Sequence, residues 1–433
     1  MTETTSGARG TYRACRAYCG DVPVRWVWLA AWPVTAVFVL SNAATPLYVL
    51  WQREMGFSGG TLTVVFACYI AGLLGSLLVS GVVSDRIGRK PVLLPALGLA
   101  LLACLVFATA GGVAALITAR LCTGIAVGAV VSAGMAAVTD VAGPARRRLA
   151  ALLASCAMVF GAGLGPLLAG VLSEAAPGPT VTVFAVEAVL LVTAVAVVVR
   201  MPVRRPAGTG TDTGAGADAG AAAGVRLRPR AWIRVPGVPR GAGRQLGLGL
   251  AVFAPGITAT SFVLSLGPSL LADLLGTGSR IASGALAFGM FLSATGVQFA
   301  VRRLPRRTVL VTGAGATALG MLALVTAVRT GSVAALVAAA PLAGAGQGLG
   351  QLGGLSLLNS TVPVEGLAEA NAALNVGGYL PAGVLPVLVG YGSDAVGLTA
   401  AATVFGTALA VVAVVGGGLV PLLGRRGSVE PAG

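Results

Sequence analysis

The stretch "SGVVSDRIGRKPVLL", residues 80–94, gathers several charged side chains between two long apolar segments. Asp85, Arg86, Arg89 and Lys90 all lie within it. A helix of about 20 apolar residues crosses a bilayer, and charged side chains between two such segments stay outside the hydrocarbon. The stretch therefore predicts a short, charged hinge between two membrane-spanning helices.

The composition of the whole chain agrees with a membrane protein. Of 433 residues, 56% are hydrophobic and only 10% are charged, and the mean hydropathy is +0.91. A soluble chain of this length needs more charge to cover its surface. We therefore predict an all-α membrane protein.

The positions of the basic residues and the absence of histidine argue against several classes of function. The formal net charge is +15, but the basic residues lie in loops and tails rather than beside aromatic residues on one domain, so no nucleic-acid partner is expected. No histidine occurs, and the six cysteines lack metal-ligand spacing. We expect no metal, no cofactor and no enzymatic site.

Hydropathy divides the chain into twelve predicted spans. Their approximate ranges are 26–49, 60–83, 91–110, 113–139, 149–173, 180–200, 246–271, 281–301, 308–327, 332–358, 368–390 and 398–421. Most Lys and Arg residues fall in the two tails and in alternate loops. Because cytoplasmic loops collect basic residues, both termini are predicted to be cytoplasmic, in a multi-pass protein of the plasma membrane.

The chain also divides into two similar halves. "DRIGRKPVLL" (85–94) aligns with "RRLPRRTVLV" (302–311), where Arg302 takes the place of Asp85, and an offset of 220 superposes Gly124 and Gly128 on Gly344 and Gly348. Such duplication predicts two pseudo-symmetric six-helix bundles around a central site. The predicted parts are an N-tail (1–24), an N-terminal bundle (25–200), a flexible Gly/Ala-rich linker (201–245), a C-terminal bundle (246–421) and a C-tail (422–433).

The charged loop resembles the signature between helices 2 and 3 of the major facilitator superfamily. The matching residues of the Gly-x-x-x-Asp-Arg-x-Gly-Arg-Lys pattern are Gly81, Asp85, Arg86, Gly88, Arg89 and Lys90. The resemblance implies twelve helices and a loop that holds the two halves in the outward-facing state. Asp140, at the cytoplasmic end of the fourth span, is expected to pair with Arg89. An ordinary basic loop is the alternative.

Two further motifs resemble this family. "RLCTGIAVG" (120–128) is similar to its Arg-x-x-x-Gly motif, which suggests a coupling role for Arg120; snorkelling to the interface is the alternative. "GAGLGPLLAG" (161–170) resembles the helix-packing motif of the drug/proton antiporters, through Gly161, Gly165, Pro166 and Gly170. Ala169 replaces one expected glycine, and generic helix packing is the alternative reading.

Polar residues within the spans are the candidates for coupling and substrate binding. Glu187 alone among the acidic residues lies well inside a span, where it could carry protons or simply stay neutral. The resemblance implies that the first, fourth, seventh and tenth helices line the cavity, and they offer Asn42, Arg120, Gln347 and Gln351. Asn375 and Tyr379 share one face of the eleventh span. These stripes could equally join helices to one another.

The combined features predict a secondary active transporter that works by alternating access. The leading hypothesis is proton-coupled efflux of a small organic or drug-like molecule by a monomer embedded in the lipid bilayer. The alternative is metabolite uptake by symport or facilitation, and a non-transporting membrane receptor is the rival from another class.

Overall fold

The computed structural model describes residues 23–202, 237–239, 241–276, 279–301, 303–363 and 366–424. The helices in this part of the chain are α2 (Val24–Ala43), η1 (Thr45–Leu47), α3 (Tyr48–Met55), α4 (Gly59–Ile87), α5 (Lys90–Ala108), α6 (Val113–Ala129), η2 (Val130–Gly134), α7 (Met135–Ala142), η3 (Pro144–Arg146), α8 (Arg147–Ala175), α9 (Pro179–Arg200), α10 (Gly243–Leu275), α11 (Arg280–Ala300), α12 (Arg306–Thr330), α13 (Val333–Thr361), α14 (Leu367–Val396) and α15 (Leu398–Gly424).

Twelve helical segments of the described chain are long and apolar enough to cross a membrane. They match the twelve predicted spans one to one, and most extend a few residues further because polar residues can continue a helix beyond the apolar core. The first span continues through η1 and α3 to Met55. Most of the predicted N-tail, C-tail and linker, and Arg302, lie outside the described residues.

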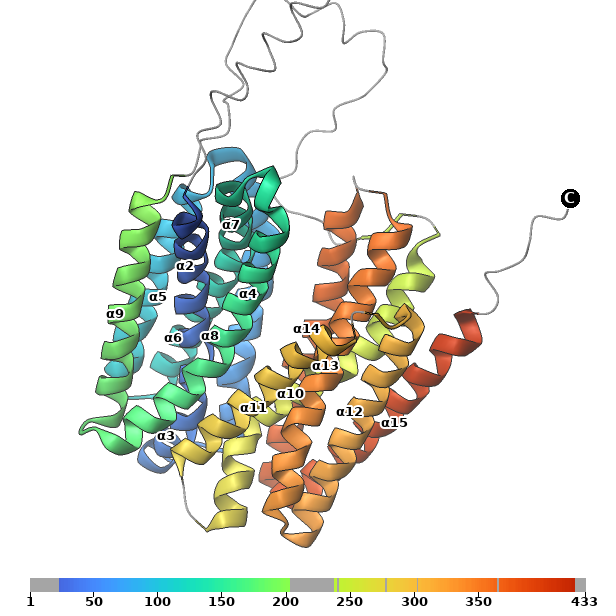
Figure 1. Ribbon diagram of the computed structural model, residues 1–433. Helices are drawn as coiled ribbons and strands as arrows, with labels where there is room; N and C mark the ends of the chain where they lie inside the picture. The colour runs from blue at the N-terminus through green and yellow to red at the C-terminus, as the bar shows by residue number, and fades with distance from the viewer. Residues whose placement is uncertain are drawn as a thin grey trace, which may run out of the picture.

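The twelve spans form two bundles, α2–α9 and α10–α15, called here the N half and the C half (Figure 1). The "linker end" of the molecule is the end where α9 stops at Arg200 and α10 starts at Gly243. The "far end" is the opposite one, where α3 lies (Figure 1). The halves lie close together at the far end and diverge toward the linker end (Figure 1).

Glycines place equivalent helices in close contact in both halves. At each of four positions an added Cβ would collide with a backbone carbonyl of the neighbouring helix: Gly124 with Tyr69, Gly128 with Leu73, Gly344 with Met290 and Gly348 with Ala294. These are the glycines that the offset of 220 superposes. Small residues let membrane helices approach closely, so the repeat in the sequence corresponds to a repeated packing contact.

The fourth span contains an irregular turn next to the space between the halves. Val130–Gly134 forms a single π-helical turn between α6 and α7. Such turns often mark functional positions, because the extra residue per turn redirects side chains. Val131 of this turn and Met135, which follows it, both line the cavity described below.

Candidate substrate cavity

A cavity of about 730 Å³ lies between the two halves. Its walls come from α2, α4, η2, α7 and α8 of the N half and from α10–α14 of the C half. Leu304 and Arg306, at the connection between α11 and α12, place one part of the cavity at the linker end. This volume is within the range of small-molecule binding sites, and its position between duplicated halves is typical of transporters.

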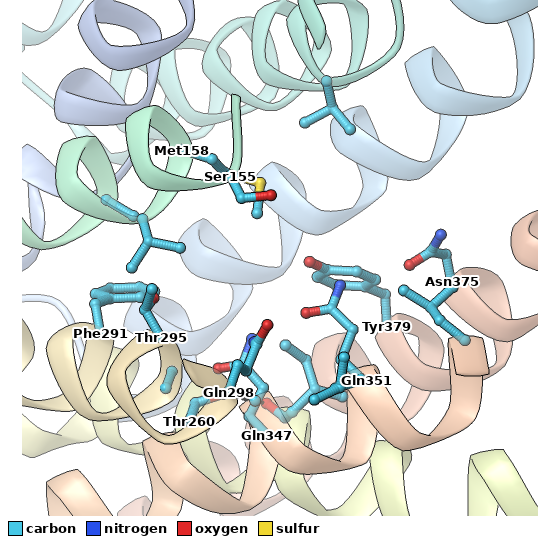
Figure 2. Close-up of a pocket in the computed structure, with 18 of the residues that line it drawn as sticks. Ser155, Met158, Thr260, Phe291, Thr295, Gln298, Gln347, Gln351, Asn375 and Tyr379 are labelled. Atoms are coloured by element: carbon cyan, nitrogen blue, oxygen red, sulfur yellow. Dashed lines mark hydrogen bonds between the residues drawn. The ribbon is translucent and has the colours of Figure 1, made fainter. Parts of the chain in front are cut away.

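The two walls differ in polarity. The N half contributes Asn42, Tyr69 and Ser155 among mainly apolar side chains such as Phe38 and Met158. The C half contributes most of the polar side chains, namely Thr260, Ser261, Thr295, Gln298, Arg306, Gln347, Gln351, Ser356, Asn375 and Tyr379. Figure 2 shows Gln298, Gln347 and Gln351 across the cavity from Ser155 and Met158. Among the described lining residues, only Arg306 is charged.

Two oxygen atoms of the polar wall lack a hydrogen-bond partner within the described residues. They are Oγ1 of Thr295 and Oε1 of Gln347, and both are buried. Buried polar atoms in proteins nearly always have a partner, so each unpaired atom needs an explanation. Because both residues line the cavity, a bound molecule that donates hydrogen bonds would satisfy them.

Five predicted substrate residues line this cavity: Asn42, Gln347, Gln351, Asn375 and Tyr379. The sequence reasoning missed Thr260, Thr295, Gln298, Arg306 and Ser155, which the structure brings to the same space. Thr295 and Gln298 lie about one turn apart on α11, and that spacing is the signal that could have found them.

Arg120 is buried in the N half and does not line the cavity. Its side chain is 0% exposed, and Nη1 donates a hydrogen bond to the carbonyl of Ser41 at 2.7 Å. The rings of Tyr48, Phe66, Tyr69 and Phe107 lie 5.0–6.0 Å from its guanidinium carbon. The alternative of snorkelling to the interface is therefore wrong, because the aromatic rings and the Ser41 carbonyl hold the cation inside the bundle.

Nε and Nη2 of Arg120 have no hydrogen-bond partner within the described chain. Phe66 and Tyr69, which contact the guanidinium, also line the cavity. A buried cation is therefore separated from the cavity by a layer of aromatic side chains. The predicted coupling role of Arg120 stays a prediction.

Glu187 is buried in α9 and, like Arg120, does not line the cavity. The residue is 2% exposed, and its Oε2 has no partner among the described residues. The α9 helix packs on α5, α2 and α8 within the N half. A carboxyl group here would exchange protons only through neighbouring side chains or water, so proton transfer by Glu187 stays a prediction.

The charged loop forms a compact cluster at the linker end. Arg89 donates hydrogen bonds to Asp85 (Nη1–Oδ1, 2.6 Å), to Asp140 (Nε–Oδ2, 2.9 Å) and to Ser84 (Nη1–Oγ, 2.9 Å). Burial favours the neutral guanidine, but the hydrogen bonds and charges of Asp140 and Asp85 outweigh it and raise the pKa of Arg89. The expected pair of Arg89 with Asp140 is therefore confirmed.

The neighbouring residues of this loop fit the same arrangement. Gly88 has a positive φ of 99°, a conformation that glycine adopts without strain, and it ends α4. Lys90 donates to the carbonyl of Val199 at the end of α9. The contacts described for Arg89 and Lys90 join α4, α5, α7 and α9, all within the N half. The predicted role of the loop in holding the two halves together stays a prediction.

The glycines of the predicted packing motif on α8 face two different helices. A Cβ at Gly161 or Gly165 would collide with a carbonyl of α2, and one at Gly170 would collide with the Arg280 carbonyl of α11. Pro166 lies between these contacts, and Gly284 of α11 packs on its carbonyl. The α8 helix thus packs closely on its own half at one part of its length and on the C half at another.

Twelve membrane-spanning helices in two similar halves around a shared cavity define a membrane transporter. The family model of the Major Facilitator Superfamily matches residues 27–304, and the chain belongs to this family. As a member of this family, the protein is a membrane transporter.

Two transporters resemble part of the chain. Major facilitator-type transporter psiT2 of Psilocybe cubensis is 37% identical over 127 residues, which cover 29% of this chain and 23% of the relative. The 3-(3-hydroxy-phenyl)propionate transporter of Escherichia coli (strain K12) is 32% identical over 133 residues, which cover 31% of each protein. The matched stretches thus span under a third of either relative.

Solved structures resemble the whole fold. A bacterial homolog of the human lysosomal transporter Spinster, in an inward-facing and unoccupied conformation, has a TM-score of 0.69 at 15% identity, covering 95% of this chain and 100% of that one. The nucleoside transporter NupG has a TM-score of 0.66 at 12% identity, covering 92% and 99%. At these identities the likeness establishes the fold alone.

Proposed function

We propose that this protein is a proton-coupled exporter of a small, amphipathic organic molecule, working as a monomer in the plasma membrane. The cavity between the halves carries the proposal, since it has the volume of a small-molecule site and reaches the linker end. With both termini in the cytoplasm, the linker end is the cytoplasmic side and the far end is the outer side. Rocking of the two halves would then expose the cavity to each side in turn.

The walls of the cavity favour a neutral or weakly charged substrate. The carboxamides and hydroxyls of the C half would bind its polar groups, and the apolar side chains of the N half would cover the rest. Thr295 and Gln347 offer unpaired acceptors, so the substrate should carry at least one hydrogen-bond donor. Arg306, near the cytoplasmic mouth, could attract a weak organic anion.

Uptake of an aromatic acid is the second candidate. The similarity to the 3-(3-hydroxy-phenyl)propionate transporter favours it, because such a molecule combines an apolar ring with a hydroxyl and a carboxylate. A molecule of that kind would suit the unequal walls of the cavity and Arg306, the one charged residue among its described lining residues.

Flux in proteoliposomes tests both candidates. The purified protein is reconstituted and supplied with chloramphenicol or 3-(3-hydroxyphenyl)propionate, with and without an imposed pH gradient. Antiport predicts accumulation when the vesicle lumen is acidic, whereas symport predicts accumulation when the outside is acidic. A flux that is the same with and without either pH gradient would contradict proton coupling.

A second arm of this experiment examines the proton carrier. Glu187→Gln keeps the shape of the side chain but cannot release a proton. If Glu187 carries the coupling proton, this variant should lose the response to the gradient while its yield stays unchanged. An unchanged gradient response would exclude Glu187 from coupling.

A further inference from the structure

A five-residue pattern occurs at the same place in both halves, near the far end of two helices. The α8 helix carries "GVLSE" (170–174) and α14 carries "GYGSD" (390–394), so Gly-x-x-Ser-acid repeats at an offset of 220. This is the offset that relates the packing glycines of the two halves. The acidic residues of the pattern, Glu174 and Asp394, are both exposed on the surface of the molecule.

Each of these carboxylates binds the N-terminus of a helix in the other half. Asp394 of the C half accepts hydrogen bonds from the backbone N–H groups of Gly59 and Gly60, both at 3.0 Å, where α4 begins. Glu174 of the N half accepts from the N–H groups of Arg280 and Ile281, the latter at 3.1 Å, where α11 begins. We call these two arrangements the clasps.

The clasps complete the caps of both helices. The first N–H groups of a helix lack partners within the helix and form its positive end. Ser58 and Ser279, at the N-caps, accept from the third amides, those of Thr61 and Ala282, at 3.2 and 3.3 Å. The carboxylate from the opposite half binds the two amides that precede each of these. Each helix start is therefore satisfied partly by its own half and partly by the other.

The remaining residues of the pattern allow this close approach. An added Cβ at Gly170 would collide with the carbonyl of Arg280, and one at Gly390 would lie 2.9 Å from the carbonyl of Gly59. Ser173 and Ser393 donate to the carbonyls of Gly170 and Gly390 at 3.0 and 2.6 Å. The serine hydroxyls are thus occupied within their own helices, while the acidic side chains reach across to the other half.

The clasps cross the interface between the halves at the end where the bundles meet (Figure 1). The cavity lies between them and the linker end. Gln52 and Ser269 add a hydrogen bond of 3.2 Å between the halves. For the cavity to open at the far end, α4 must separate from α14 and α8 from α11, and both carboxylates must leave their amides.

We propose that Glu174 and Asp394 are positioning residues for transport that hold the far end closed and set the balance between the two access states. The inference rests on the alternating-access function proposed above. Because the two clasps occupy equivalent positions and each carboxylate binds two amides, we expect similar contributions to closure, and removing both should have a larger effect than removing either. Loss of the charge at a helix N-terminus shifts such an equilibrium by roughly fivefold per clasp.

Distance measurements between the halves test this proposal. Spin labels are attached at Thr109→Cys and Thr330→Cys, two exposed positions at the far ends of α5 and α12, in protein whose native cysteines are replaced. Pulsed electron spin resonance then gives the distribution of far-end distances. Glu174→Gln and Asp394→Asn should each raise the population of the longer distance roughly fivefold, and the double variant should raise it further.

The matched control is Glu54→Gln, which removes an exposed carboxylate from α3 at the same end of the molecule. It should leave the distance distribution unchanged. An unchanged distribution in the double variant, with the protein still folded by circular dichroism, would overturn the proposal. The labels report conformation without any substrate, so that outcome is distinguishable from a failure of transport in the flux experiment.

Discussion

Thr295 and Gln347 differ from most polar side chains in the spans of this protein. Several buried hydroxyls bind a carbonyl one turn back in their own helix; Thr258 donates to Ala254 at 2.7 Å and Thr260 to Ile257 at 2.9 Å. Such groups are satisfied without a ligand. Thr295 Oγ1 and Gln347 Oε1 are buried, face the cavity and lack a partner within the described chain. Under the proposed function, the substrate would be the partner of both atoms.

We expect Thr295→Val and Gln347→Leu each to weaken substrate binding. Each change removes, at nearly constant volume, an acceptor that the proposed substrate would use. The loss of one such hydrogen bond is worth about 1 kcal/mol, or about fivefold in the apparent affinity. The flux KM measures the effect. Thr326→Val is the control, because Thr326 is exposed on α12 and bonds only its own helix in the described structure. If Thr295→Val and Gln347→Leu have the KM of the parent protein, as expected for the Thr326→Val control, a binding role of these residues is contradicted.

At the scale of the helix, close backbone contacts join α8 to α2 within the N half. Gly165 lies so near the carbonyl of Val39 that no side chain fits between α8 and α2. Gly161 makes a similar contact with Thr35. Membrane helices gain little from excluding water, so such close van der Waals contact is a main source of their association.

Gly165→Ala should therefore destabilise the protein, and Gly98→Ala should not. The added methyl at Gly165 forces α8 away from α2, which costs about 1–3 kcal/mol. Nothing lies within 4 Å of a Cβ at Gly98, in the exposed part of α5, where alanine also favours the helix. Thermal unfolding in detergent measures both. A melting temperature for Gly165→Ala equal to that of the parent would show that α8 can shift without cost.

The helices themselves could be predicted from the sequence, but the face that each one turns to the cavity could not. Length and hydropathy determine a span, so all twelve were predictable. The spacing of Gln347 and Gln351 indicated a shared face, and both line the cavity. Arg120 and Glu187 looked equally suitable but lie inside the N half, because the packing of neighbouring helices decides which polar residues are accessible.

At the scale of the whole molecule, the two halves meet at one end and separate at the other (Figure 1). The charged cluster of Asp85, Arg89 and Asp140 lies at the separated end, and the clasps lie at the closed end. The described contacts of Arg89 stay within the N half. Under the proposed topology, in which the linker end is cytoplasmic, this distribution corresponds to an inward-open state with the outer contacts formed.

Asp85→Asn should impair transport without reducing the amount of folded protein. The change removes the charge of one of the two carboxylates that Arg89 binds, and so weakens the arrangement of the loop between α4 and α5. The initial rate of flux should fall several-fold, and Glu54→Gln at the far end serves as the control. A normal rate for Asp85→Asn would exclude a role of this loop in the transport cycle.

The orientation of the whole bundle is tested separately. Reporter fusions in the C-tail and in the linker should lie in the cytoplasm, whereas a fusion at Gly111, between α5 and α6, should lie outside. Alkaline phosphatase, active only outside, and a fluorescent protein, active only inside, give opposite readings. A C-tail on the outer side would contradict the proposed topology.

The unequal walls of the cavity have a consequence for how cargo would travel. A molecule bound by amides and hydroxyls of the C half would remain bound to that half as the two halves rock. The mainly apolar surface of the N half would move relative to it. Departure would then begin when water reaches the carboxamides and competes for their hydrogen bonds. The C half would then hold the substrate while the N half moves over it. The extent to which the N half excludes water from the cavity would govern the turnover rate.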